Sequence, residues 1–305
     1  MAQNTSNTAL PQSLPTVMMF AGPNGSGKST VTKPFLAAHF EGEYINADDI
    51  AKTLEAEIPD YTERNMRAAD IATERRDTAL RNGESFAFET VMSTPEKVAL
   101  MTQARGLGYQ VSLLFVTTND PEINVQRVAL RVEAGGHAVD PVAIRKRYAQ
   151  TMDLLACAVE HADFASIFDN TGSYVIDVAV KEDDGVLHLT PNAEGIAWVF
   201  DKLRQPYYIR QQSRLDCAAI VGDARPIVPA VAEDLKDYHG VILHVTPWHV
   251  LQDVAGGLVL HDRQLSATQA CTVGQVQTVS YRYKFGKLVD LAVPAPVKTS
   301  APRPR

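Results

Sequence analysis

The sequence of 305 residues has few cysteines, no long apolar run and no basic leader. The three cysteines, Cys157, Cys217 and Cys271, are odd in number and far apart, which argues against a disulfide framework or a metal-ligand spacing. We therefore expect reduced thiols and a cytoplasmic location. No stretch of 18 apolar residues occurs, so we expect no membrane-spanning helix. Residues 1–15 lack the pattern of a secretory signal, and we expect them to form a disordered tail.

The sequence also lacks a general excess of positive charge, since its formal net charge is −7. Residues 1–204 carry 18 Lys and Arg against 28 Asp and Glu, whereas residues 205–305 carry 11 against 8. An acidic body does not attract a polyanion, so nucleic acid is not the expected partner of the first two thirds. We expect the basic end, residues 294–305, to be disordered and solvated.

What is present in the first two thirds is an alternation of strand and helix patterns. Strands are predicted at 17–21, 42–46, 85–91 and 109–117, and helices at 27–39, 51–81, 94–105, 121–134 and 142–161. Two further strands are expected around the Asp184-Gly185 turn. Strands that alternate with helices predict an α/β fold with a doubly wound, mostly parallel sheet, here over residues 16–204. A linker is expected at 205–232 and a small all-β domain at 233–293, because short β-type runs there are broken by glycines.

The sequence GPNGSGKS begins at Gly22, directly after the first predicted strand, and fits the phosphate-loop pattern G-x-x-x-x-G-K-[ST]. Its glycines let successive backbone N–H groups face a β-phosphate at a helix N-terminus. Lys28 would lie between the β- and γ-phosphates, and the Ser29 hydroxyl would coordinate Mg²⁺. We therefore predict ATP and Mg²⁺ as cofactors. The predicted nucleotide-binding residues are Gly22, Pro23, Asn24, Gly25, Ser26, Gly27, Lys28, Ser29 and Thr30.

Guanine-reading and motor-type acidic motifs are missing, whereas polar residues follow two of the strands. Ligands bind at this edge of an open α/β sheet. Asp48 is the candidate base for an acceptor hydroxyl, with Asp49 as the alternative, and helix capping is the competing explanation for both. Glu89 would bind the acceptor or support Mg²⁺. Thr90 and Ser93 could add hydroxyl contacts to the acceptor, or could simply be turn residues.

Phosphoryl transfer needs positive charge over the γ-phosphoryl group, and a pair of predicted helices joined by Ala134-Gly135-Gly136-His137 supplies arginines as a lid. Arg127 and Arg131 are four residues apart and share a helical face. Arg145 and Arg147 point apart, so at most one is expected to reach the phosphates. His137 could touch phosphate or acceptor, or could be a surface turn residue.

These residues together resemble the zeta-toxin family of P-loop kinases over about residues 16–200. The resemblance rests on GPNGSGKST, YINADDIAK, FAFETVMS, YQVSLLFVT, RVALRVEAGGHAVDPVAIRKRY and HADFASIFDNTG, in this order. It implies ATP- and Mg²⁺-dependent phosphorylation of a nucleotide sugar, UDP-N-acetylglucosamine, and a toxin whose nucleotide site is blocked by an antitoxin partner. It also implies Asp48 as the base, Glu89 as the acceptor-binding acid, and Arg131 with Arg145 or Arg147 at the phosphates. Where the best-characterised toxins have Glu-Gly-Thr-x-Arg, this sequence has Glu89-Thr90-Val91-Met92-Ser93.

Residues from about 233 to 293 are similar to a KfrB-type module, through their glycine and strand spacing with LQ and LHD. This similarity implies that the C-terminal domain docks a partner. Two alternatives to a nucleotide-sugar kinase stay open. One is a P-loop kinase for a nucleoside, a nucleotide or an RNA end, and the other is an ATP-dependent binding or switch protein.

Overall fold

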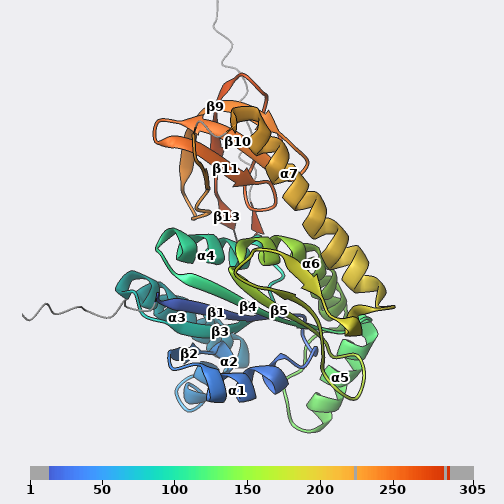
Figure 1. Cartoon of the computed structure of the whole chain (residues 1–305). Helices are drawn as coiled ribbons and strands as arrows, with labels where there is room; N and C mark the ends of the chain where they lie inside the picture. The colour runs from blue at the N-terminus through green and yellow to red at the C-terminus, as the bar shows by residue number, and fades with distance from the viewer. Residues whose placement is uncertain (1–13, 223–224, 285–286, 289–305) are drawn as a thin grey trace, which may run out of the picture.

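The computed structural model describes residues 14–222, 225–284 and 287–288, and most of residues 1–15 and all of 294–305, the expected tails, lie outside this range. The described residues form two main sheets with helices around and between them (Figure 1). None of the helices in these ranges is long and apolar enough to cross a membrane.

The larger sheet has seven strands in the order β2-β3-β1-β4-β5-β6-β7. Its strands are β1 (Thr16–Ala21), β2 (Glu43–Ile45), β3 (Phe86–Thr90), β4 (Gln110–Thr117), β5 (Phe164–Asp169), β6 (Ile176–Lys181) and β7 (Leu187–Leu189). The first five strands are parallel to one another. Strand β6 pairs antiparallel with β5, and β7 pairs antiparallel with β6. The predicted doubly wound, mostly parallel sheet is thus confirmed. Strand β5 was not predicted, because polarity does not follow burial along it: Phe164 and Phe168 are partly exposed, whereas Asp169 is buried.

Helices cover both faces of this sheet (Figure 1). They are α1 (Lys28–His39), α2 (Ala47–Thr53), α3 (Tyr61–Asn82), α4 (Pro95–Gly106), α5 (Pro121–Glu133) and α6 (Pro141–His161). Helix α1 packs on a small apolar cluster with Met18, Phe20, Ala87 and Leu114. The opposite face carries the main core, which includes Val17, Phe86 and Phe88 and the buried side of α4 and α6. Neighbouring side chains of β3 therefore point to different faces, and Glu89 shares the α1 face with Ala87.

The smaller sheet lies beyond α4 and α6, on the main-core side (Figure 1). Its strands are β8 (Ile227–Pro229), β9 (Asp237–Val245), β10 (His249–Val254), β11 (Gly257–Asp262) and β12 (Val276–Ser280), in the order β12-β9-β10-β11-β8. A short pair, β13 (Tyr283–Lys284) and β14 (Lys287–Leu288), follows. We call residues 227–288 the C-terminal module; they overlap the β-domain expected at 233–293.

The segment after residue 204 corrects the linker prediction. It folds as α7 (Gln205–Val221), which continues the π-helical turn η2 (Val199–Arg204); a 3-10 turn, η1 (Pro191–Ala193), precedes them. Pro206 lies two residues after the π-helical turn, so its missing N–H falls where the regular helical ladder of hydrogen bonds already changes. The helix buries Tyr207, Arg210 and Cys217, and Cys217 packs on β10 and β11 in an apolar cluster. After α7, the expected linker also contains β8, which pairs with β11 of the smaller sheet.

Candidate functional site

The phosphate loop connects β1 to α1 at the carboxyl edge of the large sheet. Gly25 and Gly27 have φ angles of 76° and 87°, a region that side chains other than glycine rarely adopt. A Cβ atom on Gly27 would lie 2.2 Å from Nδ2 of Asn170, and one on Gly25 would lie 2.5 Å from the backbone oxygen of Asn124. The glycines are thus required by close approach as well as by backbone conformation.

Two asparagines hold the loop from outside and were not singled out from the sequence. The Nδ2 atom of Asn124, on α5, donates to the backbone oxygen of Asn24 at 2.8 Å. The Nδ2 atom of Asn170, directly after β5, donates to the backbone oxygen of Ser26 at 2.8 Å. Asn170 follows a strand at the ligand-binding edge, a signal that was hidden because β5 itself was missed.

Lys28 is the first residue of α1, and its ammonium group turns back over the loop. Nζ donates to the backbone oxygens of Gly22 at 2.8 Å and Pro23 at 3.0 Å. Burial lowers the pKa of Lys28 to about 8, against the opposing effect of the carboxylates of Glu89 and Asp48. The amine is therefore a buried group that gains from a nearby anion.

Glu89 lies next to Ser29 because β3 is the neighbour of β1, with Glu89 paired to Phe20. Ser29 Oγ donates to Glu89 Oε2 at 3.2 Å. The other carboxylate oxygen, Oε1, is buried and has no hydrogen-bond partner among the described residues. A hydroxyl and a carboxylate at this distance are the kind of oxygen pair that Mg²⁺ accepts as ligands.

The two acidic residues of the second strand end have different surroundings. Asn46 caps α2, and its Oδ1 accepts from the backbone N–H groups of Asp48 at 2.8 Å and Asp49 at 3.4 Å. The capping role considered for the aspartates thus belongs to Asn46. The Asp49 carboxylate binds Lys52 at 2.6 Å, whereas Asp48 lines the pocket beside the phosphate loop.

The predicted lid arginines also differ in their surroundings. Arg127 and Arg131 line the pocket, and Arg131 Nη2 also donates to the backbone oxygen of His137 at 3.1 Å. Arg127 Nη2 donates to the Thr171 backbone oxygen at 3.4 Å, while its Nη1 is buried and lacks a partner in the described part of the chain. Arg145 does not reach the pocket, because it forms two bonds of 2.6 and 2.8 Å with the Glu122 carboxylate.

Of four further predicted residues, three do not line the pocket and one does. Arg147 is exposed and, like Ser93, is not among the residues that line the pocket. The His137 ring packs against Tyr61 of α3, with centroids 5.0 Å apart, so it fixes the lid loop to α3. Thr90 does line the pocket, and its hydroxyl accepts from the Met92 N–H at 3.1 Å.

The site as a whole is a pocket of about 380 Å³ at the carboxyl edge of the sheet. It is lined by Asn24, Gly25, Gly27, Lys28, Ser29, Thr30, Asn46, Ala47, Asp48, Glu89, Thr90, Val91, Arg127 and Arg131. A phosphate loop between a parallel strand and a helix, with cations above it, defines a nucleotide-binding P-loop domain of kinase-like fold.

Comparisons with known proteins agree with this class. Residues 17–154 match the AAA domain family, and residues 237–290 match the KfrB domain family. The first match covers the phosphate loop and most of the large sheet, and the second covers most of the C-terminal module. A relative from Haemophilus influenzae, described as an uncharacterized protein, is 27% identical over 138 residues, which cover 43% of this chain and 91% of the relative.

Similar solved structures include the AvrRxo1-ORF1:ORF2 complex with ATP, at a TM-score of 0.50 and 18% identity. The match covers 63% of this chain and 64% of that one, so this chain spans somewhat less than two thirds of its length. The PezAT chromosomal toxin–antitoxin system of Streptococcus pneumoniae matches at a TM-score of 0.40 and 13% identity, over 69% of this chain and 88% of that chain. At such identities the AvrRxo1-ORF1 match shows a shared fold.

Proposed function

We propose that the protein is an ATP-dependent phosphotransferase that acts on a hydroxyl group of a small molecule. The observation that carries this proposal is the shared pocket of the phosphate loop, Arg127, Arg131 and the Asp48 carboxylate. Glu89 already offers a carboxylate for Mg²⁺, so nucleotide binding alone needs no second carboxylate at Asp48. A kinase needs one to orient the acceptor hydroxyl and to accept its proton.

Each residue then has a role in one displacement. The acceptor oxygen forms a bond to the γ-phosphorus, the bond from that phosphorus to the β–γ bridging oxygen breaks, and ADP leaves. Asp48 accepts the hydroxyl proton. Lys28, Arg127 and Arg131 stabilise the charge on the phosphoryl oxygens, and Asn124 and Asn170 keep the loop amides in place. The arginines also exclude water, which would otherwise compete as the acceptor.

The residues present fit a divalent cation. Ser29 Oγ and the Glu89 carboxylate would hold Mg²⁺, because both offer oxygen ligands and Glu89 Oε1 is buried without another partner in the described chain. Bound Mg²⁺ neutralises charge on the β- and γ-phosphates. This arrangement favours the metal-supporting role for Glu89 over the acceptor-binding role.

The leading candidate acceptor is a nucleotide sugar, UDP-N-acetylglucosamine, as the resemblance to zeta toxins implies. The protein would then be a toxin with an antitoxin partner, and the two-protein AvrRxo1-ORF1:ORF2 complex supports a protein partner. Growth arrest on expression of the wild type, and normal growth with Lys28→Ala, would support the toxin role. Equal growth of the two strains would count against it.

Transfer of label from γ-³²P-ATP to UDP-sugars, nucleosides and short RNAs tests the activity. Asp48→Asn should lower kcat by about 10²–10⁴-fold and leave ATP binding unchanged. Asp49→Asn is the matched control, since Asp49 is the next residue but binds Lys52, and it should keep nearly full activity. Label on another member of the panel would identify a different acceptor and would still support the kinase activity. Bound ATP with no transfer to any acceptor would favour the nucleotide switch.

A further inference from the structure

Three elements from distant parts of the chain meet in a buried charged cluster beyond the nucleotide site. Arg210 of α7 is 1% exposed and lies between Glu160 of α6 and Asp262 of β11, which are 3% and 4% exposed. Arg210 Nε donates to Glu160 Oε2 at 2.6 Å, Nη1 donates to Gln264 Oε1 at 2.7 Å, and Nη2 donates to Asp262 Oδ2. One guanidinium thus joins the P-loop domain, α7 and the C-terminal module.

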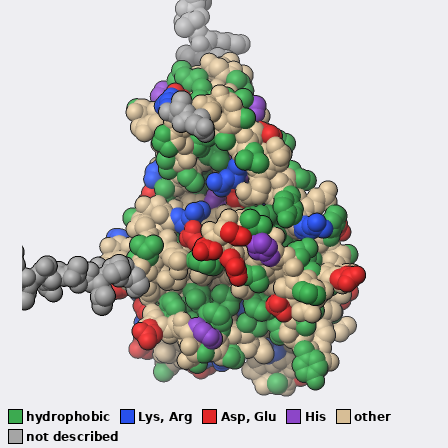
Figure 2. All heavy atoms as spheres, in the orientation of Figure 1, with side chains coloured by type: hydrophobic (Ala, Val, Ile, Leu, Met, Phe, Trp, Pro, Cys, Tyr) green, Lys and Arg blue, Asp and Glu red, His purple; other side chains and the backbone are tan. Residues whose placement is uncertain are grey.

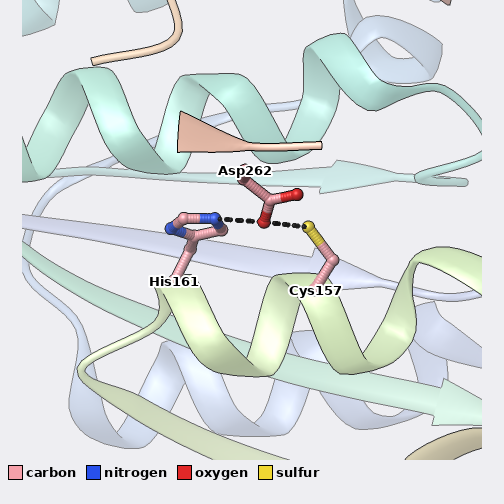
Figure 3. A group of neighbouring side chains, drawn as sticks. All are labelled: Cys157, His161 and Asp262. Carbon is pink, nitrogen blue, oxygen red and sulfur yellow. Dashed lines mark hydrogen bonds and ion pairs between the residues drawn. The ribbon is translucent and has the colours of Figure 1, made fainter. Parts of the chain in front are cut away.

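The carboxylates of Glu160 and Asp262 also have other polar partners. Glu160 Oε1 contacts His249 Nε2 of β10 at 3.0 Å and Arg214 Nη1 of α7 at 3.2 Å. Asp262 Oδ2 accepts a hydrogen bond from the Cys157 thiol at 3.3 Å and contacts Nε2 of His161 at 2.9 Å. Both of these α6 side chains therefore point toward β11 (Figure 3).

A metal ion is the first alternative to consider for this cluster. Cys157, His161 and Asp262 offer sulfur, nitrogen and oxygen atoms within 4.8 Å of one another. However, the Asp262 oxygen that a cation would need already accepts a bond from the Arg210 guanidinium. Burial also raises the pKa of the Cys157 thiol, which favours the protonated form that donates to Asp262. The guanidinium therefore takes the place that a metal cation would occupy.

We propose that this cluster is an intramolecular docking surface. The His249–Asp262 end of the C-terminal module binds the Arg210–Glu160 pair that α7 and α6 present, and it holds the module as a fixed part of the P-loop domain. Removing one partner from this buried cluster would leave the others uncompensated, which costs far more than losing an exposed ion pair. This end of the module is therefore closed to outside partners, which must use another part of its surface.

The docking surface is also connected to the loops of the nucleotide site through α6. Nearer its N-terminus, Tyr148 Oη donates to the Thr118 backbone oxygen at 2.6 Å, and Thr151 Oγ1 donates to the Val91 backbone oxygen at 2.8 Å. Val91 lines the nucleotide pocket. The same helix thus contacts the pocket loops and the module.

Two variants of the full chain distinguish docking by charge from metal binding. Asp262→Asn should lower the melting temperature by on the order of 10 °C and speed amide hydrogen exchange in β10 and β11. Cys157→Ser is the matched control, because it removes one thiol contact and keeps the ion pairs, and its melting temperature should stay within about 2 °C of wild type. Metal analysis of the purified protein should find no stoichiometric zinc.

Equal loss in both variants, together with about one zinc per chain in the wild type, would overturn docking by charge in favour of a metal site. Exchange in β10 and β11 that is fast in the wild type, or that Asp262→Asn leaves unchanged, would show a tethered module instead. Should Asp262→Asn fail to fold, Arg214→Gln serves, since this side chain is 35% exposed and bonds to Glu160 at the rim of the cluster. It should speed the same exchange to a smaller extent, and no change would contradict the proposal.

Discussion

Asp48 and Asp49 show how far two adjacent residues of the same type can differ in what they do. Both lie in the first turn of α2, where Asn46 accepts from their backbone N–H groups. Successive helical side chains point about 100° apart, so one carboxylate lines the pocket while the other binds Lys52. The sequence left this choice open, and the helix start at Ala47 decides which carboxylate lies at the phosphate loop.

At Glu89 we expect substitution to separate metal binding from nucleotide binding. Glu89→Gln keeps the size of the side chain but removes the charge beside Ser29, so the Mg²⁺ concentration needed for tight ADP binding should rise about tenfold. Calorimetric titration of ADP with and without Mg²⁺ measures both affinities, and the metal-free affinity should not fall. Asp48→Asn is the control, and an equal metal effect in the two variants would contradict the assignment.

Lys28 should make nucleotide binding depend on pH. Its pKa is about 8 in the free protein because the amine is buried, and bound phosphates favour the charged form. ATP affinity should therefore be highest below pH 8 and fall as the pH rises through 8, with proton uptake on binding. Titration in buffers of different ionisation enthalpy counts these protons. Arginine in the Lys28→Arg variant stays charged, so this variant should not take up a proton on ATP binding. Proton uptake that persists in the variant would show that another group takes up the proton.

At the scale of elements, α5 and α6 are the predicted lid helices, and of these two α5 alone supplies arginines to the pocket. Arg131→Gln should slow single-turnover transfer by about 10³-fold, as expected when a cation at the transferring phosphoryl group is lost. Arg145→Gln is the matched control on α6, because it removes only the exposed contact with Glu122. Rapid-quench measurement of both rates tests this, and equal losses would mean that the lid closes with α6 over the phosphates.

The elements that the sequence predicted are those whose pattern depends on neighbours along the chain. The apolar runs of β1 and β4 and the Asp-Pro starts of α5 and α6 need only local information. Helix α7 was mistaken for linker because its buried face is narrow and includes the charged Arg210. In a sequence, a charged residue such as Arg210 indicates a solvent-exposed face. Its burial becomes understandable only with its partners Glu160 and Asp262, which are 50 and 52 residues away.

The same distinction holds for the site. The phosphate loop could be predicted because glycine, lysine and serine act within one segment. Asn124 and Asn170 could not, since their role is a contact with a loop 100 and 144 residues away. The choice among the four arginines likewise required the position of Glu122, which removes Arg145 from the pocket.

At the scale of the whole molecule, the buried cluster should make the fold acid-sensitive. Burial alone would raise the pKa of Glu160 and of Asp262, but hydrogen bonds from His249 and His161 and the charge of Arg210 outweigh it, so both pKa values are lowered. A carboxyl group whose pKa is lowered by folding adds stability above its unfolded pKa of about 4 and loses it as the pH falls below that value.

We therefore expect this contribution to stability to be constant from pH 8 to about 5 and to be lost below about 4. Melting temperatures across this range measure it. Asp253→Asn is the control, because Asp253 forms an exposed ion pair with Arg225. The melting temperature of this variant should fall with pH as steeply as that of the wild type. A melting temperature that stays level down to pH 3 would show that the cluster carries no such charge.

The contact of Asn170 with the loop also has a consequence for synthesis on the ribosome. The loop backbone at Ser26 is translated 144 residues before the amide that holds it. At about 5–20 residues per second, that delay is roughly 7–30 seconds. During this interval the nascent chain has its glycines and Lys28 but not the asparagine that secures the loop. The complete set of contacts that hold the loop can therefore form only after β5 and Asn170 have been synthesised.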